Sequence, residues 1–262
     1  MQQITSLQNP LVKYLFTLTQ KSKQRKEQQQ FLIEGKREIS LALEARYLIE
    51  QLFICPDILS EAEVEKLFSG YKCTAISTQV YEKLTYRSST EGILALAQCK
   101  NHALSGVDFQ KAHPLVLVAE APEKPGNIGA LLRTADAAGI DAVYIANPKT
   151  DLYNPNIIRS SVGTVFTVPI FMGSSEEIRS HLQQQGFAIY CAALTASQPY
   201  DQVSYKGHTA IVVGTEDTGL SPTWLKASTQ NIIIPMQGKI DSMNVSVSAA
   251  ILIFEAVRQR KG

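Results

Sequence analysis

The feature that most constrains the fold of this chain is a regular alternation of short apolar runs and helix-like segments over residues 114–260. Residues 114–120 are almost continuously apolar, which is typical of a strand covered on both faces. Further strands are expected at residues 141–146, 166–169, 187–193, 210–214 and 231–235. Strands that alternate with helices favour a mostly parallel sheet with helices on both faces, so we expect an α/β fold.

Capping residues mark several helix boundaries in this region. A helix that starts at about Asn127 ends before Gly139, which suits the left-handed position after a helix. Asn154-Pro155 opens another helix, and Ser174 with Glu177 forms a capping box for the next. Helices are therefore expected between the strands, the last of them running to about residue 260.

The first hundred residues predict a second, smaller α/β layer. An amphipathic helix begins after Asn9-Pro10. Strands are then expected at residues 31–34, 52–55, 73–76 and 93–98, with helices at 36–47, 60–68 and 78–84. The periodicity lapses at about residues 100–113, which we interpret as a linker. We therefore expect two domains, residues 1–105 and 106–262.

Composition argues against several classes of protein. The chain has 262 residues, 45% of them hydrophobic and 19% charged. It has no apolar run of about 18 residues and no apolar signal core at its start, so a cytoplasmic location is expected. The four cysteines form no CxxC pair and are expected to be reduced packing residues. The four histidines have no ligand spacing, so no metal is expected.

Positive charge is concentrated at the front of the chain. The net charge is only +1, but residues 1–37 carry seven basic residues against two acidic ones. Such a patch is suited to binding phosphates. A solvated helix face around residues 21–26 is the alternative, and charge alone leaves both open.

Three segments that follow strands are unusual for strand-to-helix junctions: residues 120–135, 214–221 and 234–248. Because ligands collect at the carboxyl ends of parallel strands, we expect these segments to form a binding site together. The third runs into a helix whose first turn is expected to carry Ser242, Asn244 and Ser246. No G-x-G-x-x-G follows a strand and no G-x-x-x-x-G-K-[ST] occurs, so dinucleotide- and nucleoside-triphosphate-binding classes lose support.

Together these segments resemble the signatures of the SpoU (TrmH) family of RNA ribose 2′-O-methyltransferases, within the SPOUT superfamily. The matching segments are Asn127-Ile-Gly-Ala-Leu-Leu-Arg133, Gly214-Thr-Glu-x-x-Gly219, and Ile234-Pro-Met with Ser242-Met-Asn-Val-Ser-Val, in the family's order. Arg159-Ser-Ser-Val-Gly163 also fits between the first two. Residues 1–105, with Glu34-Gly-Lys-Arg37, look like the N-terminal RNA 2′-O-ribose methyltransferase substrate-binding domain of many members.

The resemblance implies a trefoil knot in residues 106–262, S-adenosylmethionine as the cofactor, and a homodimer with the active site at the subunit interface. The positions that match the family's catalytic residues are Arg133, Asn127, Glu216, Ser242 and Asn244. Those that match its cofactor-binding residues are Gly214, Ile234, Met243, Glu216, Met236, Asn244 and Val245. The residues expected to contact RNA are Lys36, Arg37, Arg25 and Arg159.

Each implied role has a structural alternative. We expect Arg133 to orient a substrate phosphate and the ribose hydroxyl and to stabilise developing negative charge, because a guanidinium stays protonated and is a poor base. It could instead be an ordinary surface residue. Asn127 could cap its helix and Ser242 could be an N-cap. Met236 and Met243 could simply fill the core.

These observations predict an enzyme that methylates a ribose 2′-hydroxyl in structured RNA, ribosomal rather than transfer RNA because of the N-terminal domain. The alternative is a non-catalytic RNA-binding or ribosome-assembly protein that retains the fold, which would need neither Arg133 nor Asn127. A knotted enzyme that methylates a base nitrogen is disfavoured by Ser242-Met-Asn-Val. One position departs from the family: Asp217 stands where glycine usually follows the motif glutamate, and cofactor affinity could suffer.

Overall fold

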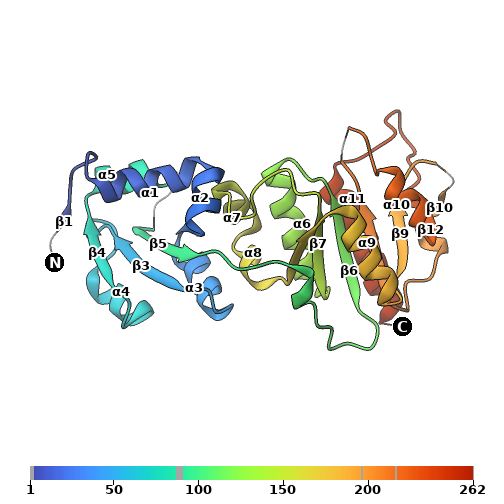
Figure 1. The fold of residues 1–262 in the computed structure, drawn as a ribbon, viewed down its shortest axis with the longest axis horizontal. Helices are drawn as coiled ribbons and strands as arrows, with labels where there is room; N and C mark the ends of the chain where they lie inside the picture. The colour runs from blue at the N-terminus through green and yellow to red at the C-terminus, as the bar shows by residue number, and fades with distance from the viewer. Residues whose placement is uncertain (1–2, 87–90, 196, 216, 262) are drawn as a thin grey trace. The chain divides into compact units, whose positions relative to one another are not determined.

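The computed structural model describes residues 3–86, 91–195, 197–215 and 217–261. The chain is divided into two compact units (Figure 1). The first unit comprises Met1–Asn101 together with Asp151–Thr167, and the second comprises His102–Thr150 together with Val168–Gly262. Residues 151–167 therefore belong to the first unit, although they lie between two strands of the second in the sequence.

The first unit is built on a five-stranded mixed sheet with the order β1-β4-β3-β5-β2. β4 pairs in parallel with β1 and β3, whereas β5 runs antiparallel to β3 and β2. The strands are β1 (Gln3–Ile4), β2 (Gln30–Glu34), β3 (Ile49–Ile54), β4 (Cys73–Ile76) and β5 (Ile93–Gln98). All but the two-residue β1 were predicted from the sequence.

Helices α1 and α5 pack on one face of this sheet. Leu15 of α1 and Tyr81 of α5 join Leu94 of β5 in one buried cluster. The first helix begins where predicted because the side chain of Asn9 accepts a hydrogen bond of 2.8 Å from the amide of Leu11. The helices of this unit include α1 (Pro10–Gln20), α2 (Ser22–Gln28), α3 (Lys36–Glu44), α4 (Glu61–Phe68), α5 (Thr78–Leu84), α7 (Pro155–Ser161) and α8 (Thr164–Thr167).

Residues 151–167 are held in the first unit by buried aromatic rings and an ion pair. The ring of Phe31 stacks on that of Tyr153 at a centroid distance of 4.1 Å, and the ring of Phe166 lies 6.0 Å from Phe31. Arg25 forms an ion pair with Asp151, and both side chains are almost fully buried. Because aromatic rings bury large apolar areas, these contacts make the segment a structural part of the first unit.

The second unit is built on a seven-stranded sheet with the order β10-β12-β9-β11-β6-β7-β8. Every pairing between neighbours in this order is parallel. The strands are β6 (Leu115–Glu120), β7 (Ala142–Ala146), β8 (Ile170–Gly173), β9 (Ala188–Ala192), β10 (Ser197–Pro199), β11 (Thr209–Val213) and β12 (Gln230–Ile233). The predicted α/β fold with a mostly parallel sheet is confirmed.

Helices cover both faces of this second sheet, as Figure 1 shows. On one face, Ile178 of α9 and Trp224 of α10 pack with Val118 of β6. On the other, α11 and α6 pack against each other and against the central strands. The helices of this unit include α6 (Pro125–Ala138), α9 (Ser175–Gln184), α10 (Pro222–Ala227) and α11 (Val245–Arg260), with short 3-10 helices η1 (Leu104–Gly106) and η2 (Tyr200–Gln202).

The helix ends of the second unit follow the predicted capping residues. The Oγ of Ser174 accepts a hydrogen bond of 3.2 Å from the amide of Glu177, and Oε2 of Glu177 accepts one of 2.8 Å from the amide of Ser174. The amide and the hydroxyl of Ser174 hold the pKa of Glu177 below its usual value. Gly139 follows α6 in the left-handed conformation, at φ 62°. Both capping predictions are confirmed.

Two predicted boundaries are wrong. The strand expected at residues 166–169 is instead helix α8 followed by β8, because Phe166 packs its ring on Phe31 of the first unit and Pro169 precedes the strand. The last helix begins at Val245 and not earlier, so Ser242 precedes the helix and Asn244 is its N-cap. The short strands β1 and β10 were not predicted, whereas α2 agrees with the alternative of a helix around residues 21–26.

The four cysteines are free, as predicted, and Cys55 and Cys191 are buried. Burial raises the pKa of Cys191 to about 12, so this thiol stays protonated near neutral pH. Within the described ranges, no helix combines the length and apolarity needed to cross a membrane. The same residues contain no group of three or more His, Cys, Asp or Glu side chains arranged to hold a metal ion.

Candidate active site

Two adjoining cavities lie at the carboxyl ends of β6, β11 and β12 in the second unit. The larger cavity has a volume of about 580 Å³ and is lined by the turn after β11, the loop after β12 and the first turns of α11. The smaller cavity, of about 120 Å³, is lined by the loop after β6, the start of α6 and the same turn after β11. The three segments that were expected to form a site together therefore converge.

The larger cavity collects positions that were predicted to bind the cofactor. It is lined by Gly214, Ile234, Met236, Met243 and Val245, and also by Ser242. Both methionines are half-buried at the cavity wall and do not fill the core. The loop 234–244 lies outside helix and strand, so its backbone groups can face a ligand. Apolar walls with exposed backbone groups fit the adenosine part of S-adenosylmethionine.

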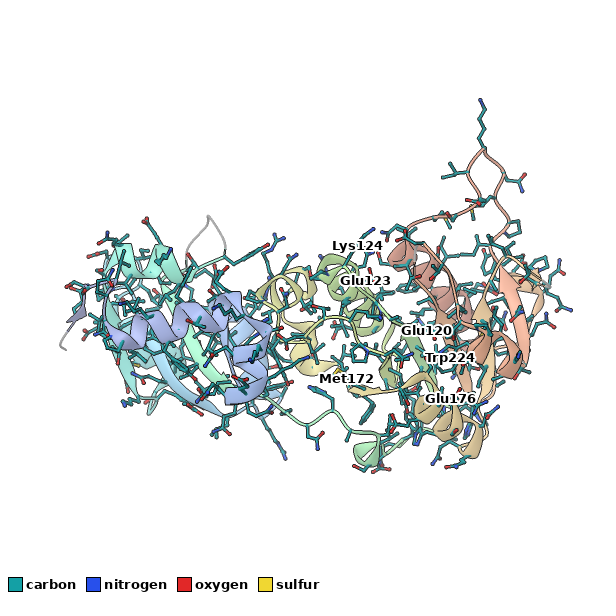
Figure 2. All side chains as sticks on the ribbon, turned by 45° about the horizontal axis from the view of Figure 1, so that its top comes forward. Glu120, Glu123, Lys124, Met172, Glu176 and Trp224 are labelled. Atoms are coloured by element: carbon teal, nitrogen blue, oxygen red, sulfur yellow. The ribbon has the colours of Figure 1, made fainter. Side chains whose placement is uncertain are left out.

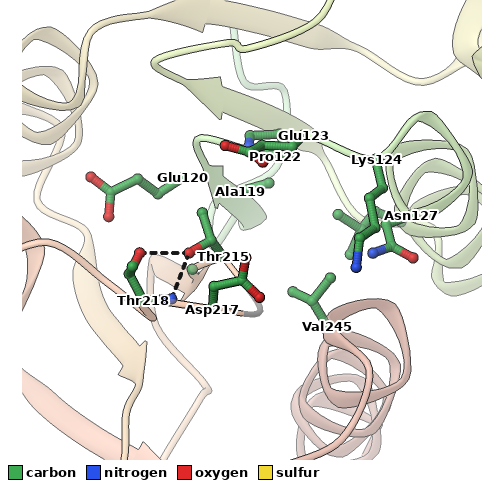
Figure 3. A pocket seen from close by; sticks show the side chains of 12 residues that line it. Ala119, Glu120, Pro122, Glu123, Lys124, Asn127, Thr215, Asp217, Thr218 and Val245 are labelled. Carbon is green, nitrogen blue, oxygen red and sulfur yellow. Dashed lines mark hydrogen bonds between the residues drawn. The ribbon is translucent and has the colours of Figure 1, made fainter.

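Gly214 is required by a close backbone contact inside the turn after β11. A Cβ at this position would lie 2.3 Å from the carbonyl carbon and oxygen of Gly219. The turn is closed by two backbone hydrogen bonds of 3.2 Å between Thr215 and Gly219, one in each direction. The hydroxyls of Thr215 and Thr218 lie 2.8 Å apart within it (Figure 3). Any side chain at position 214 would therefore push the turn out of this shape.

The smaller cavity adds charged and polar side chains from the segment 120–135 and from the turn after β11. Lys124 and Asn127 lie on one side of it, with Asp217 and Val245 nearby (Figure 3). The two cavities share a wall made by Gly214, Thr215, Asp217, Thr218 and Val245. A substrate group in the smaller cavity would therefore lie next to a ligand in the larger one.

Asn127 and Asn244 connect the first and third motifs. The Nδ2 of Asn244 donates a hydrogen bond of 3.1 Å to the Oδ1 of Asn127. The Oδ1 of Asn244 also accepts a hydrogen bond of 3.0 Å from the amide of Ser246, which caps α11. Asn127 is not a cap, because α6 begins at Pro125 and its N-cap position is Lys124. The structural alternative for Asn127 is therefore wrong, and its catalytic role stays a prediction.

Arg133 lies apart from the two cavities. It is exposed on α6, beyond Asn127 along the same helix, and is absent from the described walls of both cavities. Glu216, predicted for catalysis and cofactor binding, lies outside the described residues. Within one chain, the described parts of the site thus lack the arginine that the resemblance implies.

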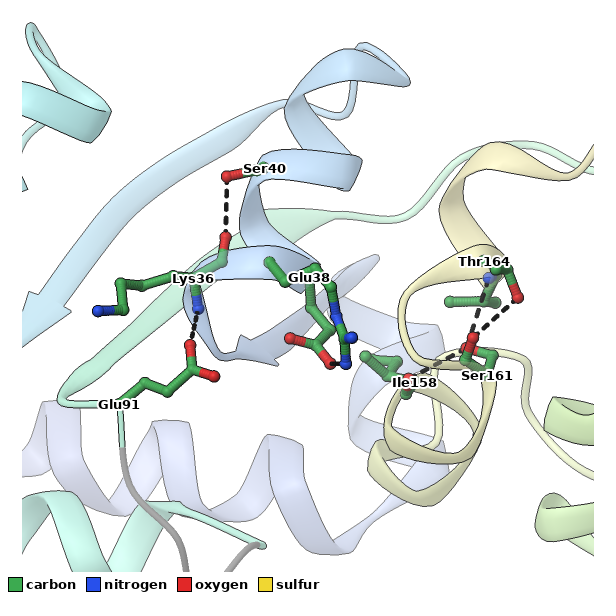
Figure 4. Close-up of polar contacts among 9 residues, drawn as sticks. Lys36, Glu38, Ser40, Glu91, Ile158, Ser161 and Thr164 are labelled. Carbon is green, nitrogen blue, oxygen red and sulfur yellow. Dashed lines mark hydrogen bonds and ion pairs between the residues drawn. The ribbon is translucent and has the colours of Figure 1, made fainter. Parts of the chain in front are cut away.

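Three of the residues predicted to contact RNA are exposed or half-buried in the first unit. The side chain of Arg37 is 58% exposed. The Nζ of Lys36 lies 2.8 Å from Glu63, and its amide donates to Glu91 (Figure 4). Arg159 lies over the ring of Tyr86, at 5.4 Å from the centroid.

Arg25, the fourth predicted RNA contact, does not fit that role. Its side chain is 3% exposed and pairs with Asp151. It also donates a hydrogen bond to the carbonyl of Leu18. Because its charge is already neutralised inside the unit, the guanidinium is not available to a phosphate, and the prediction that Arg25 contacts RNA is wrong.

A buried carboxylate beside the site was not predicted. Glu120 ends β6, is only 5% exposed and lines the smaller cavity. The sequence signal was a charged residue at the end of a strand that is otherwise apolar, where burial demands hydrogen-bond donors for the carboxylate. Figure 2 shows Glu120 near Trp224, in the second unit.

All three motifs lie within a segment that matches a known family. Residues 114–254, more than half of the chain, match the model of the SpoU rRNA Methylase family. The chain belongs to this family. In this SpoU family chain, residues 9–95 also match the MRM3-like substrate binding domain. The resemblance found in the sequence is confirmed for both parts.

Individual relatives match this SpoU family chain over nearly its whole length. It is 29% identical over 254 residues to the 23S rRNA (guanosine(2553)-2'-O)-methyltransferase RlmP of Bacillus subtilis (strain 168), covering 97% of this chain and 98% of that protein. A crystal structure of an RNA 2'-O ribose methyltransferase is similar with a TM-score of 0.87 at 39% identity, covering 100% of both chains. The SpoU methyltransferase AviRb from Streptomyces viridochromogenes, solved in complex with the cofactor AdoMet, has a TM-score of 0.89 at 25% identity, covering 97% of this chain and 99% of that chain.

Proposed function

We propose that this SpoU family protein transfers a methyl group from S-adenosylmethionine to a ribose 2′-hydroxyl in ribosomal RNA. The larger cavity carries the proposal, because five positions that match the family's cofactor-binding residues line one space. The relative RlmP is named a 23S rRNA guanosine 2′-O-methyltransferase, and AviRb was solved with AdoMet. A ribosomal RNA substrate would place the enzyme in the cytoplasm.

In this reaction the main task of the protein is to position the ribose hydroxyl against the methyl group. When bound, S-adenosylmethionine supplies a methyl group on a positively charged sulfur. Gly214, Ile234, Met236, Met243 and Val245 would hold the cofactor, and transfer of its methyl carbon to the ribose oxygen would leave the carbon–sulfur bonding pair on the sulfur and give the hydroxyl proton to water. We assign Asn127 and Asn244 to orient the ribose and Arg133 to hold the adjacent phosphate and stabilise negative charge on the oxygen. Ser242 and Glu216 would shape the reaction centre.

We propose that two copies of the chain form each active site together. Arg133 is exposed, and the described residues of its own chain leave it outside both cavity walls. The neighbouring helix α11 leaves Val247 and Phe254 each 48% exposed, which is apolar surface that a second copy would cover. A symmetric dimer would then bring Arg133 of each copy to the cavities of the other.

The N-terminal part is proposed to bind the substrate. Residues 1–105 would hold the RNA through Lys36 and Arg37, in agreement with the substrate-binding family that residues 9–95 match. Arg159 of α7, which belongs to the same compact unit, would contact a further phosphate. Residues 106–262 would form the methyltransferase domain with its C-terminal trefoil knot. The chain leaves β12, next to the edge of the sheet, and α11 then packs on α6, β11 and β6 in its middle, which supports the knot.

Transfer of a labelled methyl group tests this function. The protein is incubated with labelled S-adenosylmethionine and either ribosomal RNA, ribosomal subunits or transfer RNA, and the modified nucleotide is then mapped. We expect label in a ribosomal RNA ribose. Cofactor binding without transfer to any of these RNAs would favour the alternative of a non-catalytic RNA-binding protein.

A further inference from the structure

We infer that Glu120 is a positioning residue whose carboxylate holds the end of the 214–220 turn and so keeps the larger cavity in its cofactor-binding shape. The inference rests on the proposed use of that cavity for the cofactor. Glu120 lines the smaller cavity but is only 5% exposed. Its oxygens are engaged with protein donors, so it acts through other residues.

Three donors converge on this carboxylate. Its Oε2 accepts a hydrogen bond of 2.8 Å from the amide of Ser221. Its Oε1 accepts one of 2.7 Å from the hydroxyl of Ser221 and one of 2.8 Å from the hydroxyl of Ser175. Hydrogen bonds to a charged acceptor are stronger than neutral ones. Ser221 is therefore tied to Glu120 through both its backbone and its side chain.

The direction of the bond from Ser175 is fixed by its other partners. Its Oγ accepts hydrogen bonds of 3.0 Å from the Nε1 of Trp224 and of 2.8 Å from the Nδ2 of Asn147. With two donors aimed at the oxygen, the hydroxyl hydrogen must go to Glu120. The atom at the Oε1 position of residue 120 must therefore be an acceptor for the hydroxyl of Ser175. The atom at the Oε2 position must be an acceptor for the amide of Ser221.

Both ends of the turn are anchored on adjacent residues of β6. At its start, Val213 of β11 pairs with Ala119 of β6. At its end, Ser221 is bonded to Glu120. Between these anchors lie Gly214 and the other turn residues that form the wall between the two cavities. Loss of the second anchor would free the end of the turn while leaving its start in place.

Substitution by glutamine disturbs this arrangement without changing its size. An amide offers one acceptor oxygen and one donor nitrogen where the carboxylate offers two acceptors. If the nitrogen faces the amide of Ser221, two donors oppose each other and the backbone anchor is lost. If it faces Ser175, three donors surround one hydroxyl oxygen, and the amide of Ser221 keeps only an uncharged acceptor, which weakens the backbone anchor. Either orientation leaves a buried donor without an acceptor.

The test compares the cofactor affinity of Glu120→Gln with that of Ser175→Ala. S-adenosylhomocysteine is titrated calorimetrically into each full-length variant at a temperature where all are folded. For Glu120→Gln we expect the Kd to rise about tenfold, the effect of one lost charge-assisted hydrogen bond. Ser175→Ala removes a bond to the same carboxylate and leaves the buried Nε1 of Trp224 without its acceptor, but keeps Ser221 anchored. It should therefore lower the melting temperature with a Kd within about twofold of the wild type.

Amide hydrogen exchange gives a second readout that a general loss of stability would not produce. Exchange at Thr218 and Gly219, whose amides are bonded within the turn, should accelerate in Glu120→Gln but not in Ser175→Ala. Ser221→Ala keeps the backbone anchor and should raise the Kd less than Glu120→Gln does. If Glu120→Gln does not fold, the Kd of Ser221→Ala is compared with that of Ser175→Ala instead, and it should be the higher of the two.

A wild-type Kd for folded Glu120→Gln, or equal losses of affinity in Glu120→Gln and Ser175→Ala, would overturn the inference. Failure of the cofactor site itself is recognised separately. Gly214→Ala should abolish binding of S-adenosylhomocysteine through its clash with Gly219, whereas Gly207→Ala, where a Cβ meets nothing within 4 Å, should not. Retained binding in Gly214→Ala would refute the proposed cofactor site, whatever Glu120→Gln does.

Discussion

Asn244 at the start of α11 donates a hydrogen bond of 3.1 Å to Asn127 in the first turn of α6, so the first and third family motifs meet through two side-chain amides. The same Asn244 caps its own helix by accepting from the amide of Ser246. One residue thus links the stability of α11 to the geometry of the proposed reaction centre. Its substitution should therefore have two separable effects.

Asn244→Ala should lower the free energy of unfolding by about 1 kcal/mol through loss of the cap. It should also lower methyl transfer by about tenfold or more, because the hydrogen bond that positions Asn127 against Asn244 is lost. Thermal unfolding and single-turnover transfer measure the two effects. Asn154→Ala is the matched control, since Asn154 caps α7 in the same way by accepting from the amide of Asn156. Equal activity losses in both variants would show that only helix stability matters.

Arg133→Ala should reduce methyl transfer by about 10²-fold or more, because negative charge on the ribose oxygen loses its stabilising cation. Binding of S-adenosylhomocysteine should stay close to the wild type, since Arg133 is outside the described cavity walls. Arg133→Lys should not restore activity, because lysine lacks the planar fork of donors. Arg179→Ala, on α9, is the control. A large loss of cofactor binding in Arg133→Ala would contradict the assigned role.

Mixing two inactive variants tests whether the active site is shared between subunits. Arg133→Ala and Asn127→Ala are denatured or exchanged together and refolded at equal concentrations. Half of the dimers would then be mixed, each with one intact site, which predicts recovery of about a quarter of the wild-type activity. A mixture as inactive as its components would place both residues in the same subunit's site.

Arg37→Ala should weaken RNA binding and reduce its dependence on salt. If the guanidinium neutralises one phosphate, the slope of log K against log salt concentration should fall by about 0.9 for a duplex contact. Binding is measured at several salt concentrations with a ribosomal RNA fragment. Lys66→Ala, an exposed lysine on α4, provides the comparison. An unchanged slope in Arg37→Ala would remove this residue from the RNA surface.

Arg25→Met should act on stability and not on RNA binding. Removing one partner leaves Asp151 buried without its cation, which costs about 3–5 kcal/mol. The loss should appear in denaturant unfolding, while the salt slope of RNA binding stays at the wild-type value. Lys23→Met removes a charge whose side chain is 85% exposed and should leave stability unchanged. A reduced salt slope in folded Arg25→Met would restore Arg25 as an RNA contact.

Local patterns explain which features could be predicted. The alternation of strands and helices, the cap at Asn9 and the capping box at Ser174 depend on residues a few positions apart, and all were found where expected. The strand expected at 166–169 was wrong because Phe166 is buried through a contact with Phe31, far away in the sequence. An apolar run reports that a segment is buried but not what it is buried against.

The sequence by itself determined the parallel α/β fold, the order of the three motifs and the family. Hydrophobic periodicity, capping and motif spacing each depend on residues a few positions apart, so they can be identified without the tertiary structure. Only the tertiary structure decided that Asn127 meets Asn244, that Arg25 is buried against Asp151, and that Glu120 anchors Ser221. Each of these contacts joins residues about a hundred positions apart or more. Their formation depends on how whole elements pack, which no local pattern records.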